Sequence, residues 1–133
     1  MDRSRAEQEY ARFKMTQARE TLDEARGLLA DGAELNYVVN SLFYALYYPV
    51  LALLHAKGIP SVMQSVSIAL FEKEFVKTRA IDERFFRALR RTFELKPKCS
   101  APQLTMISRH EVEALLADAA GFIDAVGLMV TDL

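Results

Sequence analysis

The side chains in this sequence best suited to binding or chemistry are basic and lie between positions 79 and 98. Arg84, Arg87 and Arg91 are three and four residues apart, so they share one face if this segment is helical. Such a face could contact the phosphates of RNA or of a nucleotide. A solvated helix face paired with acidic neighbours is the favoured interpretation, because the segment after position 108 is acidic. The full basic set is Arg79, Arg84, Arg87, Arg90, Arg91, Lys96 and Lys98.

The remaining reactive side chains predict no metal site and no cofactor. His55 and His110 lie far apart, and neither has a histidine or cysteine at metal-ligand spacing, so a structural role is favoured for both. Cys99 has two lysines nearby that could activate its thiol, but no histidine base is close in sequence. We therefore interpret Cys99 as an incidental loop residue.

Four tyrosines fall in one apolar segment, at Tyr37, Tyr44, Tyr47 and Tyr48. Aromatic rings of this kind can stack on nucleic-acid bases. Packing is the stronger expectation, with one or two of the rings buried and their hydroxyl groups hydrogen-bonded.

The hydrophobic pattern predicts five helices and no strand, over residues 15–31, 33–57, 61–77, 82–96 and 108–130. Glycines at 32 and 58 are stop signals, whereas Ser61, Asp82 and Ser108 are expected to cap the helices that follow. The second helix is apolar on every side and contains Pro49, which should kink it without ending it. Such a helix belongs at the centre of an antiparallel up-and-down bundle or in a subunit interface.

Length and composition favour one cytoplasmic domain spanning residues 1–133. The chain has 133 residues and a net charge of -1, enough for one core and without overall attraction to nucleic acid or anionic membrane. Residues 1–14 are too polar for a signal peptide, and the most apolar stretch, 42–54, is shorter than the ~20 residues of a membrane span. A single cysteine fits a reducing compartment.

Five segments, taken in order, resemble the HEPN (higher eukaryotes and prokaryotes nucleotide-binding) superfamily, specifically its small stand-alone prokaryotic members. Asn40-Ser-Leu-Phe-Tyr-Ala45 resembles the signature asparagine-arginine-x-tyrosine-tyrosine-alanine, with Ser41 in place of the arginine. The other similar segments are 18–29, 70–78, 89–96 and 113–126. The resemblance covers residues from about Met15 to Val126 and implies a five-helix HEPN-like bundle.

The resemblance also implies where a ribonuclease site would lie. Many HEPN proteins are metal-independent endoribonucleases, in which an arginine neutralises the scissile phosphate and a histidine four to six positions later acts as acid or base. Small stand-alone members often have an arginine followed by aspartate-tyrosine instead. Here Lys96 falls at the arginine, and Ser100 and Ala101 fall at the aspartate-tyrosine pair.

These replacements argue against cleavage of the family type. Lys96 supplies charge without the planar bidentate fork of arginine. Ser100 and Ala101 supply no general base, and the loss of a base typically lowers the rate by ~10²–10⁴. No arginine in the sequence has a histidine four to six positions after it.

We therefore expect a non-catalytic HEPN protein that binds RNA, a nucleotide or a nucleotidyltransferase-type protein, as family members in toxin–antitoxin pairs do. A homodimer is expected because the second helix is apolar on more faces than a small bundle needs to bury. Two alternatives stay open: a ribonuclease with an altered site built from Lys96, Arg91 and Tyr44, and a purely structural interaction module. The candidate RNA- or nucleotide-binding residues are Asn40, Tyr44, Arg91, Lys96 and Lys98.

Overall fold

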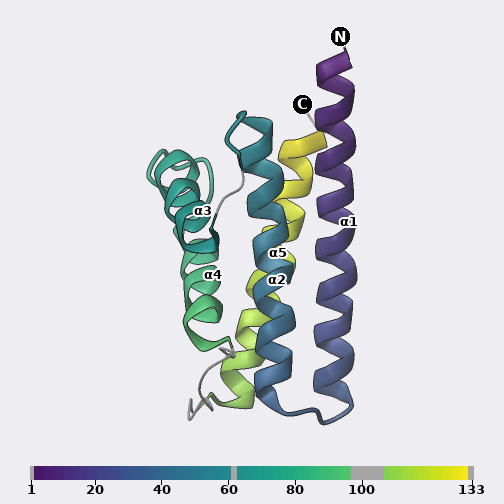
Figure 1. Ribbon diagram of the computed structural model, residues 1–133. Helices are drawn as coiled ribbons and strands as arrows, with labels where there is room; N and C mark the ends of the chain where they lie inside the picture. The colour runs from purple at the N-terminus through teal and green to yellow at the C-terminus, as the bar shows by residue number, and fades with distance from the viewer. Residues whose placement is uncertain (1, 61–62, 97–106, 132–133) are drawn as a thin grey trace.

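The structure is a computed structural model that describes residues 2–60, 63–96 and 107–131, and this part of the chain is helical without strands (Figure 1). The elements are α1 (Asp2–Ala30), α2 (Leu35–Ala56), α3 (Gln64–Phe71), a π-helical turn η1 (Glu72–Val76), α4 (Glu83–Leu95) and α5 (Arg109–Thr131). The predicted all-α bundle of five helices is confirmed. The first helix begins earlier than its apolar pattern indicated.

α2 is the central helix of the bundle. Figure 1 shows α1, α2, α4 and α5 lying along one axis in alternating directions, with α3 beside one half of α2. α2 contacts each of α1, α3, α4 and α5. Fourteen residues of this 22-residue helix are buried, including Pro49, which lies inside α2 without ending it. The prediction of a central apolar second helix is therefore confirmed.

The apolar character of α2 is explained by its burial in the bundle. Within the described residues, α2 is the one helix long and apolar enough to cross a membrane by length and composition. However, 78% of its apolar window is buried inside the protein. A core helix with this degree of burial has its apolar surface covered by other helices rather than by lipid.

α1 and α2 both end just before a glycine, as the sequence predicts. Gly32 and Gly58 have φ angles of +77° and +74°, the left-handed conformation in which a side chain is unfavourable. The amide of Ala33 donates to the Leu28 carbonyl at 3.0 Å, and the amide of Ile59 donates to the Leu54 carbonyl at 2.9 Å. These bonds satisfy carbonyl groups at the helix ends and turn the chain sharply.

Two of the three predicted N-terminal caps are present. The carboxylate of Asp82 accepts a hydrogen bond from the Arg84 amide at 2.8 Å, and the hydroxyl of Ser108 accepts one from the Glu111 amide at 3.0 Å. α3 begins at Gln64 with Met63 as its N-cap, and no side chain caps it. The predicted cap Ser61 lies outside the described residues.

Shortening a buried side chain of α2 should lower the free energy of unfolding far more than shortening an exposed apolar side chain elsewhere. The Leu46 side chain is 0% exposed in α2, whereas Leu128 in α5 is 74% exposed. Leu46→Ala should lower the free energy of unfolding by about 2–5 kcal/mol, because it leaves a cavity in the core. Leu128→Ala should change it by no more than about 0.5 kcal/mol. Urea denaturation of the two variants and the wild type measures both values, and similar losses would show that α2 is not the core helix.

Candidate nucleic-acid interface

The basic face of α4 is largely paired with carboxylates. The guanidinium of Arg84 lies 3.5 Å from the Asp118 carboxylate of α5. Arg87 and Arg90 form i,i+4 pairs with Glu83 and Glu94 at 3.7 Å and 3.9 Å. These pairs agree with the interpretation of a solvated, acid-paired helix face. They leave little uncompensated positive charge along this stretch of α4.

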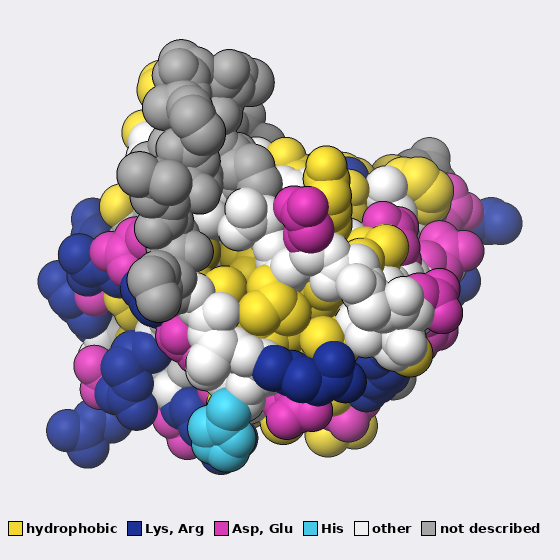
Figure 2. All heavy atoms as spheres, turned by 90° about the horizontal axis from the view of Figure 1, so that it is seen from below, with side chains coloured by type: hydrophobic (Ala, Val, Ile, Leu, Met, Phe, Trp, Pro, Cys, Tyr) yellow, Lys and Arg dark blue, Asp and Glu magenta, His cyan; other side chains and the backbone are white. Residues whose placement is uncertain are grey.

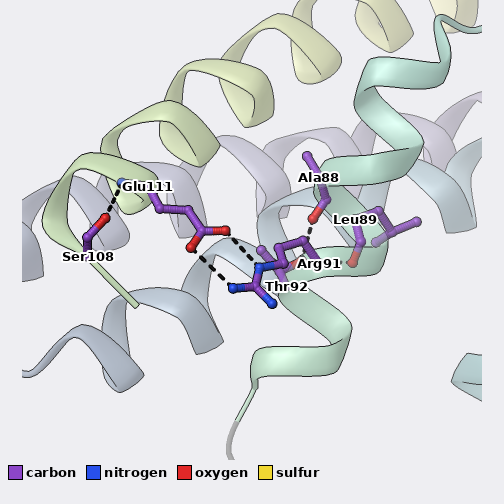
Figure 3. A network of polar contacts seen from close by, with 6 residues as sticks. All are labelled: Ala88, Leu89, Arg91, Thr92, Ser108 and Glu111. Carbon is purple, nitrogen blue, oxygen red and sulfur yellow. Dashed lines mark hydrogen bonds and ion pairs between the residues drawn. The ribbon is translucent and has the colours of Figure 1, made fainter. Parts of the chain in front are cut away.

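Arg91 is held by Glu111 across the α4–α5 interface (Figure 3). Its Nε donates to Glu111 Oε2 at 2.7 Å and its Nη2 donates to Oε1 at 3.2 Å, which is a bidentate arrangement. The hydrogen bond from Arg91 lowers the pKa of Glu111, and the same bond raises the pKa of Arg91. In a capping box the Glu111 carboxylate would reach back toward Ser108, but the guanidinium is the stronger partner. Arg91 is thus committed to a structural contact.

Lys96 lies at the junction of α2 and α4, immediately after the last residue of α4. Its Nζ is 5.3 Å from the ring centroid of Phe43 in α2 and 6.0 Å from that of Phe93 in α4. Such cation–π contacts contribute about 0.5–1 kcal/mol each at exposed sites. Among the described residues, no carboxylate lies within ion-pair distance of Lys96. The Lys96 side chain is half-buried, and no described carboxylate compensates its charge.

Phe43 links Lys96 to the tyrosines of α2. The Tyr44 ring packs edge-on against the Phe43 ring with centroids 5.0 Å apart, and Tyr48 lies 5.8 Å beyond Tyr44. Asn40 is one helical turn before Tyr44, and both side chains are half-buried. The structure therefore places Lys96, Tyr44 and Asn40 around one part of α2. We call these three residues the Lys96 face.

The other candidate residues are located differently. Arg91 turns toward α5 and Glu111, and Lys98 lies outside the described residues together with Cys99, Ser100 and Ala101. Of the remaining tyrosines, Tyr47 is 5% exposed and stacks on Phe43 with ring centroids 5.3 Å apart. Tyr37 is 61% exposed. Packing thus accounts for Tyr47 but not for Tyr37.

The histidines have no metal-binding surroundings within the described residues, where no group of three candidate ligands occurs. The His55 ring lies on the Tyr10 ring with centroids 4.1 Å apart, which joins α2 to α1. His110 is exposed in the first turn of α5. The structural interpretation of His55 agrees with this packing.

Sequence analysis missed the contribution of α1 to the flank of α2. The Lys14 Nζ lies over the rings of Tyr10, Phe13 and Tyr48, 5.2 Å from the Tyr48 centroid. Tyr10 and Lys14 are four residues apart, a spacing that could have indicated their contact. Tyr48, by contrast, is distant from Lys14 in sequence, so their contact could not be predicted without the packing of α1 on α2. We call Tyr10, Phe13, Lys14, Tyr44 and Tyr48 the aromatic strip.

A carboxylate adjoins the aromatic strip where the family signature has an arginine. The Ser41 hydroxyl donates to Glu24 Oε1 at 3.1 Å. Burial raises the pKa of Tyr48, and the nearby Tyr44 and Glu24 raise it further. The Tyr48 phenol therefore stays protonated at neutral pH and can donate a hydrogen bond but cannot act as a base.

The end of the bundle where α4 ends and α5 begins has mixed character. Figure 2 shows apolar side chains at the centre of this end, surrounded by basic and acidic side chains. A surface of this kind lacks the single-sign field that attracts long polyanions. On such a surface, any contact with phosphate would depend on a few local cations.

The Arg91–Glu111 contact should make stability depend on pH at the acidic end. Because folding lowers the Glu111 pKa, this contribution is fully present above the ordinary pKa of a glutamate and is lost as pH falls through the lowered pKa of the folded state. Glu111→Gln should lower the free energy of unfolding by about 1 kcal/mol near pH 7, a modest value since the two side chains are 41% and 35% exposed. The difference from wild type should shrink near pH 3.

Glu113→Gln is the matched control for this measurement. It removes the exposed i,i+4 pair of Arg109 and Glu113, whose side chains are 60% and 53% exposed. Urea unfolding should show a loss of at most about 0.5 kcal/mol for this variant. Equal losses in the two variants at both pH values would contradict a special role for Arg91–Glu111.

Comparison with known proteins assigns the chain to a family. A family model described as the HEPN domain matches residues 11–129. The chain is 36% identical to a UPF0332 protein of Thermotoga maritima over 116 residues, which is 87% of each chain. It is 27% identical over 103 residues to a Methanocaldococcus jannaschii protein named as a candidate toxin, covering 77% of this chain and 70% of that protein. The chain belongs to the HEPN family.

Proposed function

We propose that this HEPN protein is a non-catalytic homodimer that binds RNA or a nucleotide at the Lys96 face, in a toxin–antitoxin-like pair. The observation that carries the proposal is the Lys96 ammonium, held on Phe43 and Phe93 without a carboxylate partner among the described residues. An uncompensated cation beside a half-buried tyrosine combines phosphate attraction with an aromatic edge. Asn40 adds an amide that can donate or accept hydrogen bonds at the same face.

The geometry supports binding rather than phosphodiester cleavage. Arg91 uses Nε and Nη2 on Glu111, so these donors are not directed at a phosphate. Tyr48 has a raised pKa and cannot remove a proton from a 2′-hydroxyl near neutral pH. Lys96 alone offers electrostatic stabilisation without an acid–base partner among the described residues. The altered-site ribonuclease remains the alternative.

The toxin–antitoxin-like context rests on the relative named as a candidate toxin and on the family. In this proposal the second component is a nucleotidyltransferase-type protein, and both act in the cytoplasm. A reducing compartment suits a chain with one cysteine. A pull-down of the protein from its own cells, with the neighbouring gene product as the expected prey, addresses the partner directly.

The affinity for single-stranded RNA should fall as the salt concentration rises. Contact between Lys96 and a phosphate should account for part of this salt dependence. Lys96→Gln should lower the affinity about fivefold or more and reduce the slope of log K against log salt by about 0.7 per site. Lys73→Gln is the control, because Lys73 is an exposed lysine of η1 and lies outside the Lys96 face. Fluorescence anisotropy with a labelled oligonucleotide measures the affinity and the slope.

The same samples distinguish the rival functions. Wild type incubated with labelled RNA and a chelator should leave the RNA intact. Cleavage by wild type that disappears in Lys96→Ala would establish the ribonuclease instead. RNA affinity that is absent at low salt would leave a structural interaction module as the function. RNA affinity that is present but unchanged in Lys96→Gln would contradict binding at the Lys96 face.

The homodimer in this proposal uses the aromatic strip. Most of the apolar surface of α2 is covered within one chain, so the surface left for a second copy is its flank beside α1. Phe13 is 60% exposed there, next to Lys14 and the half-buried Tyr48. Exposed aromatic residues are enriched at protein–protein interfaces, where they bury large areas at low entropic cost.

Phe13→Glu should shift the protein from dimer to monomer. A charge placed against a second copy would raise the dimer dissociation constant about tenfold or more, since the carboxylate loses its water on association. Leu128→Glu is the control, because Leu128 is 74% exposed on α5 and lies outside the aromatic strip. Sedimentation velocity at micromolar concentration measures the shift. A monomeric wild type would remove the dimer from the proposal.

A further inference from the structure

One face of α1 carries four arginines at a seven-residue interval, and the last three of them line cavities shared with α5. They are Arg5, Arg12, Arg19 and Arg26. A seven-residue interval is nearly two turns, so these side chains lie in one row about 10 Å apart along the axis. Two members of the row are paired on α1 itself, Arg5 with Glu9 at 3.6 Å and Arg26 with Asp23 at 3.3 Å.

The two central arginines have no carboxylate partner among the described residues. Arg12 and Arg19 both line a cavity of about 170 Å³ in the groove between α1 and α5. Among the residues that the structure describes, no acidic side chain lines this cavity. The other lining residues are Met15, Thr16, Gly127 and Val130. Two guanidinium groups with a hydroxyl-bearing side chain between them form a surrounding that favours a negatively charged group.

Gly127 of α5 makes room for one of these arginines. A Cβ placed on Gly127 would lie 3.0 Å from Nη2 of Arg19 and would meet no other side chain within 4 Å. The absence of a side chain at this helical position therefore lets the guanidinium lie against the α5 backbone. Glycine otherwise weakens a helix interior relative to alanine. Gly127 thus leaves space for the Arg19 guanidinium, although glycine has a lower helix propensity than alanine.

We propose that the α1–α5 groove binds one phosphate-type oxyanion between Arg12 and Arg19. Arginine is suited to such a group, because its planar fork can make two parallel hydrogen bonds to the oxygen atoms. The cavity is smaller than the ~300 Å³ at which pockets for whole small molecules begin. It therefore takes a single phosphate group, either a free phosphate or phosphomonoester or one phosphodiester of RNA.

Negative charge around the neighbouring cavity limits the proposed ligand to a single phosphate group. A neighbouring cavity of about 260 Å³ along the same groove is lined by Arg19 and Arg26, and also by Asp23 and Asp124. These two carboxylates would repel a second phosphate following the groove. A continuous nucleic-acid track along the arginine row is thus disfavoured.

This oxyanion site is separate from the Lys96 face and from the aromatic strip. Lys14 follows Arg12 by two residues, which is about 200° around a helix, so the two side chains leave α1 on nearly opposite sides. Lys14 contacts Tyr48 of α2, whereas Arg12 shares its cavity with Val130 of α5. The site does not depend on the proposed contacts of Lys96 or Phe13, so variants of those two residues should leave phosphate binding intact.

Titration with inorganic phosphate, followed by amide NMR shifts against chloride at equal ionic strength, tests the site. Wild type should show saturable shifts at the Arg12, Thr16 and Gly127 amides. Arg19→Gln and Arg12→Gln should each weaken phosphate binding about tenfold or more. Arg26→Gln is the matched control, since it removes an arginine of the same row that is paired with Asp23, and should change binding less than twofold.

Gly127→Ala tests the geometry independently of charge. The added methyl group should displace the Arg19 guanidinium and weaken phosphate binding, while the melting temperature stays equal to wild type or rises through better helix propensity. A short RNA without terminal phosphate is titrated in parallel. Weakening with RNA as well as phosphate in Arg19→Gln supports a phosphodiester ligand, and weakening with phosphate alone supports a free phosphate or phosphomonoester. Phosphate shifts that do not saturate, or equal losses in Arg19→Gln and Arg26→Gln, would overturn the site.

Discussion

The burial of α2 is the constraint on which the rest of this structure depends. A helix that is apolar on every side cannot face water along any of its length without losing stability. The other helices each offer one apolar stripe, so several of them are needed to cover it. α1, α3, α4 and α5 all contact α2 for this reason. What α2 still presents to solvent is the polar and aromatic margin that includes Asn40, Tyr44 and Tyr48.

The charged residues follow from the same arrangement. Helices packed around a common core bring α4 beside α5, and their basic and acidic faces then neutralise each other through Arg84–Asp118 and Arg91–Glu111. The charges of α4 and α5 are therefore arranged largely as ion pairs rather than as two separate patches. Against this neutral background, a single unpaired cation such as Lys96 has a local effect on an approaching phosphate.

Local features of the fold were predictable from the sequence, because each depends on neighbouring residues. Glycine at 32 and 58, Asp82 and Ser108 mark helix ends through bonds that span only a few positions. The start of α1 was placed too late, since residues 2–14 lack a clear apolar stripe. Their helix is supported instead by polar spacing, as in the Arg5–Glu9 pair.

The candidate site was predictable only in part, because its contacts join distant segments. Tyr44 and Lys96 were identified by type and alignment, yet their connection through Phe43 depends on how α4 packs on α2. The partner of Glu111 was missed for the same reason. Its spacing from Ser108 predicts a capping box, but Arg91 lies twenty residues earlier and offers two charge-assisted hydrogen bonds.

The replacement of the signature arginine by Ser41 has a consequence for the charge of the α2 margin. Ser41 is neutral, so its hydrogen bond to Glu24 supplies no positive charge to the carboxylate. After burial and the nearby Tyr44, the Glu24 charge also contributes to the raised pKa of Tyr48. Lys96 attracts phosphate from the α4 side. In the proposed function, Lys96 would draw an RNA phosphate toward α4, and the protonated phenol of Tyr48 could not accept a proton from the RNA, which favours binding over proton transfer.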